Sequence, residues 1–415
     1  MRYGQVSSVL RVLALVGIVV LTACQARPQG SETAGVQSGS ITFVTALAEE
    51  ERRALSEILQ TFEQQSGMRV NLVQMESQDV VNQLKAKTAA GRMDIDLVAQ
   101  DNLRLGPLVR DRSVQDLTEF RNRIPAETID ALRPVTEFNG RTYFFPYRPN
   151  VQIAYVNSAK LDQYGLKPPE TWDQLMSTAR TLREREGVGK VAIQGAAGDP
   201  LTVTVFEFIK QGGGDPLVLN DAGSVRAFEF LRDLEPYLSP EYRIAKFDTM
   251  NTILSNDTAY LGTNWPFGVN VIVRDNKRED VKAYHGWQGP AKESHVLGGE
   301  VLAIPTGAPN REGALRLAEF LMSRETQEQL LGKIGWPPMR SDAYGNVPAW
   351  QQEYFNAVQE AMRHVDARPN VGYWEDVSRA LNDAFRDIVQ NKQPVQPTLD
   401  RYAAAIQQAK QAAGE

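Results

Sequence analysis

The sequence predicts an α/β protein with two lobes, and three observations support this prediction. The chain has 415 residues, and chains beyond about 250–300 residues usually divide into more than one compact region. Strand-like apolar runs alternate with amphipathic helical stretches from Ile41 onward, an order typical of sheets covered by helices. A hydrophobic content of 42% and a charged content of 23% are those of an ordinary soluble globular protein.

The alternation is clearest between Ile41 and Ala99. A helix is predicted where five apolar residues fall on one helical face, namely Ala54, Leu55, Ile58, Leu59 and Phe62. The predicted elements are a strand at residues 41–44, this helix at 49–64, a strand at 69–73, a helix at 80–90 and a strand at 95–99. This β-α-β-α-β order predicts a sheet with covering helices.

The downstream half repeats the pattern. Strands are predicted at residues 151–155, 191–193 and 259–261. The sequence Thr171-Trp-Asp-Gln is typical of a capping box that opens a helix. Residues 311–331 are predicted as one helix, and almost all of the last 65 or so residues are helical by pattern.

Composition excludes several classes of function. The formal net charge of −6 gives no reason to expect nucleic acid or an anionic membrane surface as a partner. The chain has three histidines, His285, His295 and His364, and no pair of them has the sequence spacing typical of metal ligands. The sequence therefore predicts neither a metal site nor a cofactor.

The N-terminus has the features of an export signal. Arg2 and Arg11 precede an apolar run at residues 12–21, which is too short to span a bilayer, so residues 1–23 are predicted to be a secretory signal peptide. The following Leu-Thr-Ala-Cys24 resembles the lipobox of bacterial lipoproteins, which implies a lipid on Cys24. Cys24 is the sole cysteine, so it has no partner for an internal disulfide. Residues 24–40 are small, polar and Gly/Ser-rich, as expected of a flexible linker.

Several segments of the mature chain resemble one family. They are ITFVTALAEEERRALSEILQTFEQQSGMRV, GRMDIDLVAQDN, IAYVNSAKLDQYGLKPPETWDQL, NWPFG, LGGEVLAI, GWPPMRSDAY and RPNVGYWEDVSRAL. In this order they resemble the extracellular solute-binding proteins of family 1, the sugar receptors of bacterial ABC importers. The likeness runs from about Ile41 to Gln408 and is strongest to the trehalose/maltose-binding members.

That resemblance implies a two-lobe periplasmic-binding-protein type II fold with a hinge and an interlobe ligand cleft. Lobe 1 is predicted at residues 41–146 plus 299–338, and lobe 2 at 147–298 plus 339–415. The chain would cross between lobes near Pro146–Tyr147, Gly298–Gly299 and Pro338. The implied protein is a non-enzymatic, monomeric lipoprotein outside the cytoplasm, held at the bacterial cell membrane. It would pass a di- or oligosaccharide to the transmembrane subunits of an ABC permease.

A sugar site needs charged or polar groups for the hydroxyls and flat aromatic faces for the C–H surfaces. Asp101 ends a predicted strand, where open α/β sheets face their ligand. Trp265 follows another strand and offers a stacking face. Gly298 and Gly299 allow close backbone approach or a hinge turn. The resemblance adds Glu51, Arg368, Tyr373 and Trp374 as candidates.

Each of these candidates has a structural alternative. Glu51 also fits an acidic first helical turn favoured by the helix dipole. Asp101 also fits a turn aspartate, and Trp265 a core residue. Arg368 also fits a solvated loop arginine, and Tyr373 and Trp374 fit ordinary core. Trp336 is expected to line the cleft or to brace the hinge.

The chain departs from the trehalose/maltose pattern at three positions. Arg148 replaces a binding tyrosine, Asn150 replaces an aspartate, and Glu300 replaces a stacking tryptophan. Arg148 and Glu300 either pair with each other or contact a different ligand.

Three alternative functions therefore stay open. One is the same fold carrying a charged or amino-substituted solute, such as a polyamine, a phosphorylated polyol or an oligopeptide. Another is a secreted glycosidase that uses Asp101 and Glu300 as its two carboxylates. The third is a sensor that presents its ligand to a membrane receptor instead of a permease.

Overall fold

Two large β-sheets organise the part of the chain described by the computed structural model, residues 39–47, 49–345 and 347–414. The first sheet has the strand order β12-β11-β3-β1-β2, and β6 also pairs with β11. Its strands are β1 (Ser40–Thr45), β2 (Arg69–Gln74), β3 (Leu97–Asp101), β6 (Phe145–Val151), β11 (His295–Ala303) and β12 (Val365–Ala367). β1 is parallel to β2 and β3, whereas β11 is antiparallel to β3 and β6.

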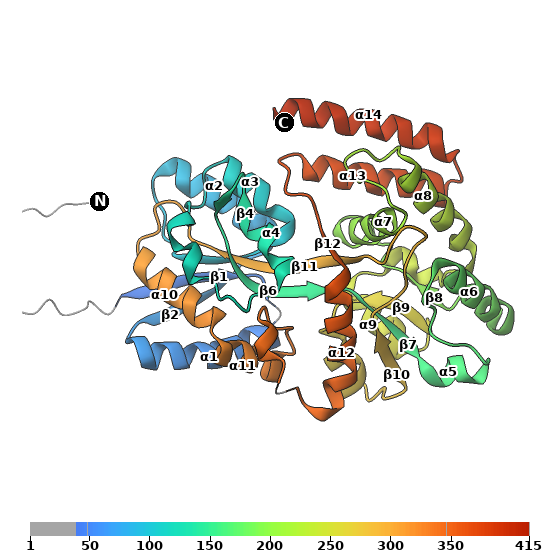
Figure 1. Ribbon diagram of the computed structural model, residues 1–415, viewed down its shortest axis with the longest axis horizontal. Helices are drawn as coiled ribbons and strands as arrows, with labels where there is room; N and C mark the ends of the chain where they lie inside the picture. The colour runs from blue at the N-terminus through green and yellow to red at the C-terminus, as the bar shows by residue number, and fades with distance from the viewer. Residues whose placement is uncertain (1–38, 48, 346, 415) are drawn as a thin grey trace, which may run out of the picture. The chain divides into compact units, whose positions relative to one another are not determined.

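The second sheet has the order β10-β7-β9-β8. Its strands are β7 (Ile153–Asn157), β8 (Val191–Ala192), β9 (Leu261–Asn264) and β10 (Val281–Tyr284). A two-stranded ribbon of β4 (Glu137–Phe138) and β5 (Arg141–Thr142) stands apart from both. In Figure 1, β6 and β11 extend from the first sheet toward the second.

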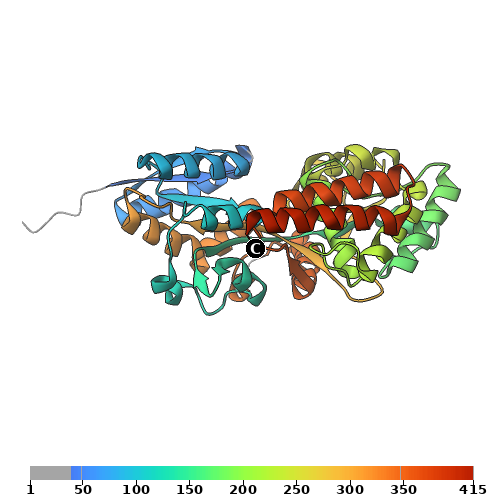
Figure 2. The same ribbon diagram turned by 90° about the horizontal axis from the view of Figure 1, so that it is seen from above.

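Helices account for most of the remaining described chain. They are α1 (Glu49–Ser66), α2 (Ser77–Ala90), α3 (Leu105–Arg110), α4 (Arg133–Thr136), α5 (Ser158–Gln163), α6 (Trp172–Glu186), α7 (Asp199–Gln211), α8 (Ala222–Leu234), α9 (Phe247–Ser255), α10 (Arg311–Met322), α11 (Arg324–Ile334), α12 (Gln352–Ala361), α13 (Trp374–Phe385) and α14 (Val395–Ala413). The last two, drawn in red in Figure 2, lie side by side.

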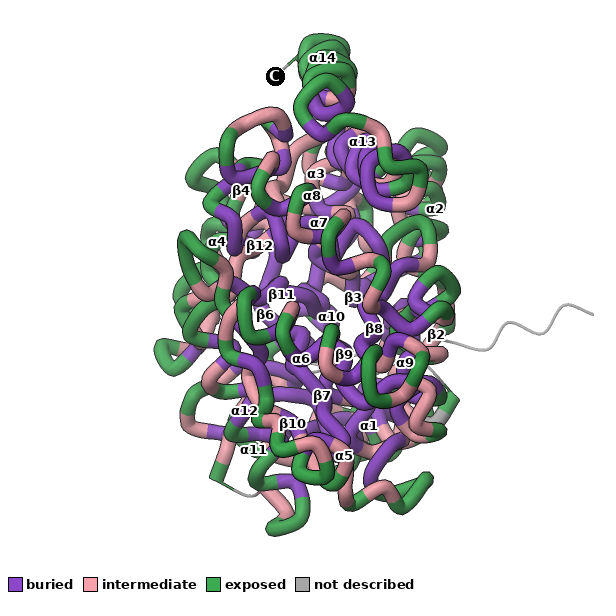
Figure 3. Tube along the Cα trace, turned by 90° about the vertical axis from the view of Figure 1, so that its right-hand side faces the viewer, coloured by how far each residue is buried: buried purple, intermediate pink, exposed green. Residues whose placement is uncertain are grey.

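The second sheet is covered on both faces. Side chains of a strand point alternately to opposite faces, and β7 follows this rule. Ile153 and Tyr155 belong to one cluster of buried hydrophobic residues, whereas Ala154 and Val156 belong to another. The first cluster includes residues of α9 and α12, and the second includes residues of α6, α7, α8, α13 and α14. Figure 3 shows the strands as mostly buried and the outer turns of the helices as exposed.

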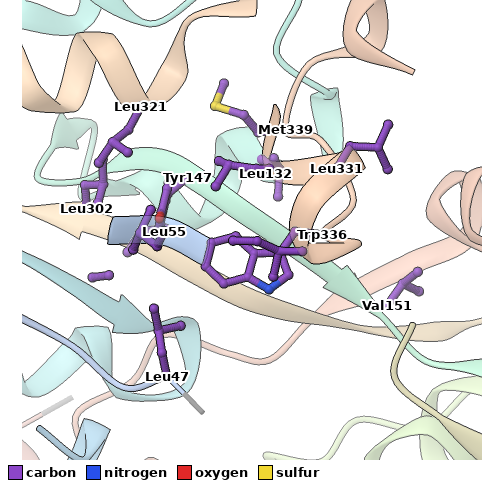
Figure 4. Close-up of a cluster of buried hydrophobic side chains, with 14 of the residues drawn as sticks. Leu47, Leu55, Leu132, Tyr147, Val151, Leu302, Leu321, Leu331, Trp336 and Met339 are labelled. Atoms are coloured by element: carbon purple, nitrogen blue, oxygen red, sulfur yellow. The ribbon is translucent and has the colours of Figure 1, made fainter. Parts of the chain in front are cut away.

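The first cluster continues into the first sheet and its helices. In Figure 4, Tyr147 of β6 lies among Leu55 of α1, Leu302 of β11 and Trp336. The rings of Tyr147 and Trp336 meet edge to face, with centroids 5.9 Å apart. Trp336 is only 3% exposed. The core of the first sheet therefore reaches up to the segment that follows α11.

The fold class predicted from the sequence is confirmed. Thr171 caps α6 as predicted, because its hydroxyl accepts a hydrogen bond from the backbone N–H of Gln174. The prediction of a single helix at residues 311–331 was wrong. The chain breaks at Ser323, which is extended (ψ 153°) and whose hydroxyl accepts from the N–H of Thr326 to start α11. The almost wholly helical C-terminal pattern also concealed β12.

Some predictions are not tested. The signal peptide, Cys24 and the linker up to residue 38 lie outside the described residues, and the lobe boundaries stay a prediction. β1 begins at Ser40, the last residue of the predicted linker. Across the described chain, none of the helices combines the length and the apolar character needed to cross a bilayer.

Candidate functional site

A cavity of about 810 Å³ lies between the two sheets. Several of its lining residues stand at strand ends: Gln74 closes β2, Asp101 closes β3, Gln194 follows β8, and Trp265 follows β9. Strand ends are where open α/β sheets bind their ligands. Further wall residues come from the starts of α1, α7 and α9, from β6 and β11, from residues 270–275, from the segment after α11 and from Arg368. Both sheets therefore contribute side chains to one site.

Strand register assembles a row of charges at the floor of this cavity. Glu300 of β11 is directly opposite Asp101 on β3 and directly opposite Arg148 on β6. Directly opposed residues of antiparallel strands put their side chains on the same face of the sheet. Three neighbouring strands thus bring together two carboxylates and one guanidinium that lie far apart in the sequence.

Arg148 is the centre of a network. Its Nη2 lies 3.3 Å from Oε1 of Glu300, and its Nη1 lies 3.3 Å from Oε1 of Glu51. The guanidinium also lies over the ring of Trp336, 4.2 Å from the ring centroid, in cation–π geometry. Trp336 completes the network because its indole N–H donates to Glu51 Oε1 over 2.7 Å. The predicted pairing of Arg148 with Glu300 is present, and Glu51 shares the same cation.

The electrostatics of this network follow from one cation facing two carboxylates. Burial raises the pKa of Glu300 to about 7, and the positive charge of Arg148 offsets this rise only in part, because Asp101 and Glu51 add negative charge nearby. Burial disfavours the charged form of Arg148, but Glu300 and Glu51 outweigh burial and raise the pKa of the guanidinium. Glu300 Oε2 is buried and has no hydrogen-bond partner among the described residues.

Arg368 lies beside Asp101 on the same wall. It follows β12 and is 5% exposed. One of its Nη atoms donates to Oδ1 of buried Asn102 and lies 3.6 Å from Asp101 Oδ1. Burial lowers the pKa of the guanidinium, and the charge of Asp101 offsets this in part. The arginine is therefore held in place by the chain itself at the edge of the cavity.

Gly298 and Gly299 have no side chains, and this allows close approach of the Trp265 ring and of the β6 backbone. A Cβ on Gly298 would lie 2.6 Å from Cζ3 of Trp265, so the indole packs directly on that glycine. Gly299 has φ +103° and its Cβ would lie 2.0 Å from the carbonyl oxygen of Arg148. A side chain at either position would displace the row of charges or the indole.

We expect Trp265→Ala to weaken solute binding by about tenfold, or about 1.4 kcal/mol, because a half-buried indole face on the cavity wall is lost. Trp287→Ala is the matched control, since Trp287 is 1% exposed in the core and its truncation should cost about 3–5 kcal/mol of unfolding free energy. Urea unfolding and solute titration of both variants separate the two roles. A Trp265→Ala variant as unstable as Trp287→Ala would make Trp265 a core residue.

The structure places nine of the eleven predicted ligand-binding residues on the cavity wall. They are Glu51, Asp101, Arg148, Asn150, Trp265, Gly298, Gly299, Glu300 and Arg368. Tyr373 and Trp374 lie elsewhere, buried in the second hydrophobic cluster, where Trp374 meets Phe206 edge to face. For these two residues the structure favours the core alternative. Solute contact by any of the nine remains a proposal.

Sequence reasoning missed part of the wall. Phe247 and Phe267 line the cavity with rings 6.3 Å apart, and Phe247 is 49% exposed. Gln194 follows a strand, and this position in the sequence was enough to predict it as a candidate for the cavity wall. Phe247 opens a helix whose pattern carries no binding signal.

Arg104 forms ion pairs between elements on the two sides of the cavity. It follows β3 and pairs with Asp199, at the start of α7, over 2.9 Å. It also pairs with Glu375, in the first turn of α13. These ion pairs join the side of the first sheet to helices that cover the second, and the linear sequence gives no sign of them.

The fold and the cavity define a two-lobe binding protein. Residues 57–356, most of the chain, match the family described as bacterial extracellular solute-binding protein. The chain belongs to this family, which places its function outside the cytoplasm and makes a small-molecule solute its ligand.

Individual relatives differ in what they bind. The spermidine/putrescine-binding periplasmic protein 1 of Haemophilus influenzae is 25% identical over 333 residues, which cover 79% of this chain and 84% of that protein. The maltose-bound MalE3 of T. maritima has a TM-score of 0.79 and 22% identity, covering 89% of this chain and 99% of that one. A solute-binding protein of an ABC transporter from Thermotoga lettingae, bound with α-D-tagatose, has a TM-score of 0.78 and 20% identity, covering 90% and 100%.

Proposed function

We propose that this chain is the lipid-anchored receptor of an ABC importer and carries a di- or oligosaccharide to the transmembrane permease subunits. The observation that carries the proposal is the mixed wall of the cavity. Aromatic faces from Trp265, Phe267 and Phe247 stand beside carboxylates and arginines in one interlobe space. Sugars require this combination, because their C–H faces pack on rings and their hydroxyls bond to charged groups.

The charge network supports a neutral solute. Arg148 is held between Glu51 and Glu300, and Trp336 covers it. The cation is therefore already neutralised by the chain, and it gains little from an anionic ligand. Glu300 Oε2, which has no hydrogen-bond partner among the described residues, is an acceptor for a solute hydroxyl. Arg148 and Glu300 then shape and orient the floor of a sugar site.

A second candidate is an amino-substituted solute such as a polyamine. Seven carboxylates line the cavity (Glu49, Glu51, Glu76, Asp101, Asp199, Asp275 and Glu300) against four cations (Arg148, Arg274, Lys333 and Arg368). A net negative wall favours a cation by Coulomb attraction. The relative named for spermidine and putrescine adds weight to this candidate. The sugar proposal is preferred because four aromatic residues, Phe247, Trp265, Phe267 and Trp336, share the wall.

We also propose that the protein binds without chemical conversion. A glycosidase needs one carboxyl to donate a proton and another to attack or activate water. Glu300 is instead paired with Arg148, and Asp101 caps the turn after β3 by accepting from the N–H of Leu103. Both carboxylates thus serve the architecture of a binding site. The membrane anchor at Cys24 and a monomeric state belong to the same proposal.

The first experiment measures the melting temperature of the full chain, purified in mild detergent, against a panel of solutes. The panel holds mono-, di- and oligosaccharides, amino sugars, sugar phosphates and polyamines. A solute that binds only the folded state stabilises it by about 2.7 kcal/mol at a hundredfold excess over its dissociation constant. We expect a clear shift with a neutral di- or oligosaccharide and an unaltered sugar after incubation.

A matched variant assigns the response to the cavity. Asp101→Ala should weaken binding by about 1–3 kcal/mol, because a charged acceptor is lost and solute groups stay unpaired. Asp130→Ala, which removes a fully exposed aspartate paired to Arg133 and outside the cavity wall, should bind as the unaltered chain does. A shift given by polyamines alone would replace the sugar with the second candidate, and cleaved sugar would overturn the proposal of binding without conversion.

A further inference from the structure

All three histidines of the chain gather around one carboxylate, away from the cavity. His285 Nδ1 lies 2.6 Å from Glu293 Oε1, and His295 Nε2 lies 3.0 Å from the same oxygen. His364 Nε2 lies 3.7 Å from Oε2, the second oxygen of Glu293. These histidines have no metal-ligand spacing along the sequence, because only the fold brings them together.

Three separate segments supply the cluster. His285 and Glu293 lie in the connection between β10 and β11, and His295 is the first residue of β11. His364 ends a short 3-10 helix, Met362–His364, immediately before β12. β12 runs parallel to β11, with Val365 opposite His295, and this pairing carries His364 to the cluster. The arrangement therefore depends on the first sheet and is fixed by its hydrogen bonds.

The spacing of the donor atoms fits tetrahedral coordination. One donor atom from each of His285, Glu293 and His295 lies within 4.8 Å of the other two. Bonds of about 2.1 Å to zinc at tetrahedral angles put neighbouring ligand atoms about 3.4 Å apart. Glu293 Oε1 lies 2.6 Å from His285 Nδ1 and 3.0 Å from His295 Nε2, the distances of hydrogen bonds. A metal would replace the shared protons and widen both separations toward about 3.4 Å.

The cluster combines burial with access from solvent. His295 is 2% exposed and the side chain of Glu293 is 17% exposed, so solvent screens both groups poorly. Lys292, the adjacent cation, is paired with Asp366. Access from solvent is open at His364, whose side chain is 42% exposed.

We propose that His285, Glu293 and His295 form a binding site for Zn²⁺ or a similar divalent transition metal. Neutral imidazoles and one carboxylate are the ligands that zinc takes in a four-coordinate site. With three protein ligands the fourth position is open to water. Bound metal joins the β10–β11 connection to His295, the first residue of β11, and so fastens the base of the strand that carries Gly298 to Glu300 into the cavity.

The test uses the full chain with an affinity tag that contains no histidine, on a Cys24→Ser background so that no thiol competes. After removal of metal with a chelator, zinc is titrated by calorimetry. We expect one zinc per chain and a higher melting temperature with zinc. Cobalt added as a spectroscopic probe should give the intense visible absorption of a tetrahedral site.

Variants identify the ligands. His285→Ala and Glu293→Gln should each weaken zinc binding at least tenfold. His364→Ala, which changes an exposed side chain beside the three ligands, should weaken zinc binding less than either of these two variants. Glu353→Gln is the control, because Glu353 is an exposed carboxylate that pairs with Lys282 of neighbouring β10. No saturable binding at micromolar zinc, or binding unchanged in His285→Ala and Glu293→Gln, overturns the proposal.

Discussion

Replacing Arg148 with methionine is expected to lower the unfolding free energy by about 3–5 kcal/mol at pH 8, the usual cost of leaving a buried charge without its partner. The side chain of Arg148 is 16% exposed and that of Glu300 is 6% exposed, so solvent screens their interaction poorly. Methionine keeps most of the volume of the arginine stem. The loss therefore reports on charge more than on a cavity. Urea unfolding followed by tryptophan fluorescence measures it.

The cost should depend on pH in a defined direction. The pKa of Glu300 in the folded chain is about 7, raised by burial above the ordinary value of 4.5. A carboxyl with a raised pKa takes up a proton on folding between these two values, so its contribution to stability falls as the pH rises through that window. Removing Arg148 takes away the cation that favours the carboxylate. The destabilisation should therefore be larger at pH 8 than at pH 5.

Two further variants control this experiment. Arg274→Met removes another arginine of the cavity wall, but its side chain is 51% exposed and its ion pair is with adjacent Asp275, so it should change stability by less than about 0.5 kcal/mol. Adding Glu300→Gln to Arg148→Met should recover most of the loss, because Glu300 is the more deeply buried of the two carboxylates that pair with Arg148. A loss below about 1 kcal/mol in Arg148→Met at pH 8 would contradict the buried-pair description.

The sequence predicted the fold class because the relevant signals are local. Helical periodicity in α1 and the capping threonine of α6 depend on neighbours along the chain, and both appear in the structure. Asp101 was predicted because a strand end is visible in the sequence. The helix boundary at Ser323 was missed because the apolar pattern continues across it on both sides.

What the sequence could not supply is register and long-range pairing. Glu300 faces both Asp101 and Arg148 because of the register of β11 with β3 and β6. A register shift of one residue would turn the Glu300 side chain to the other face of the sheet. The resemblance to a known family pointed to the positions but not to the shared cation between Glu51 and Glu300. The convergence of three histidines on Glu293 depends on the same strand and on β12, which sequence patterning did not find.

Replacing Gly299 with alanine is expected to lower the unfolding free energy by at least about 4 kcal/mol, among the largest effects for a single substitution. Gly299 has φ +103°, a backbone conformation that costs an L-residue about 1–3 kcal/mol. The added Cβ would also lie 2.0 Å from the carbonyl oxygen of Arg148 and 2.9 Å from the backbone nitrogen of Asn150. Both neighbours are backbone atoms of β6, so relief requires β6 and β11 to separate.

Gly299→Ala is expected to weaken solute binding at the cavity as well as to lower stability. Gly299 is opposite Pro149, and the register between β6 and β11 shifts at the next residue, between Glu300 and Val301. Separation of the strands there would pull Arg148 away from Glu300. The folded form of Gly299→Ala should therefore bind solute more weakly than the unaltered chain. The comparison is made at a temperature where the variant is fully folded.

Gly332→Ala is the matched control for this prediction. Gly332 lies within α11, and a Cβ there would meet no described atom within 4 Å. Alanine in a helix is favoured over glycine by roughly 0.5–1 kcal/mol, so this variant should be slightly more stable. The same chemical change is thus expected to act in opposite directions at two positions. Equal stability of the two variants in urea would contradict the steric account of the β6–β11 junction.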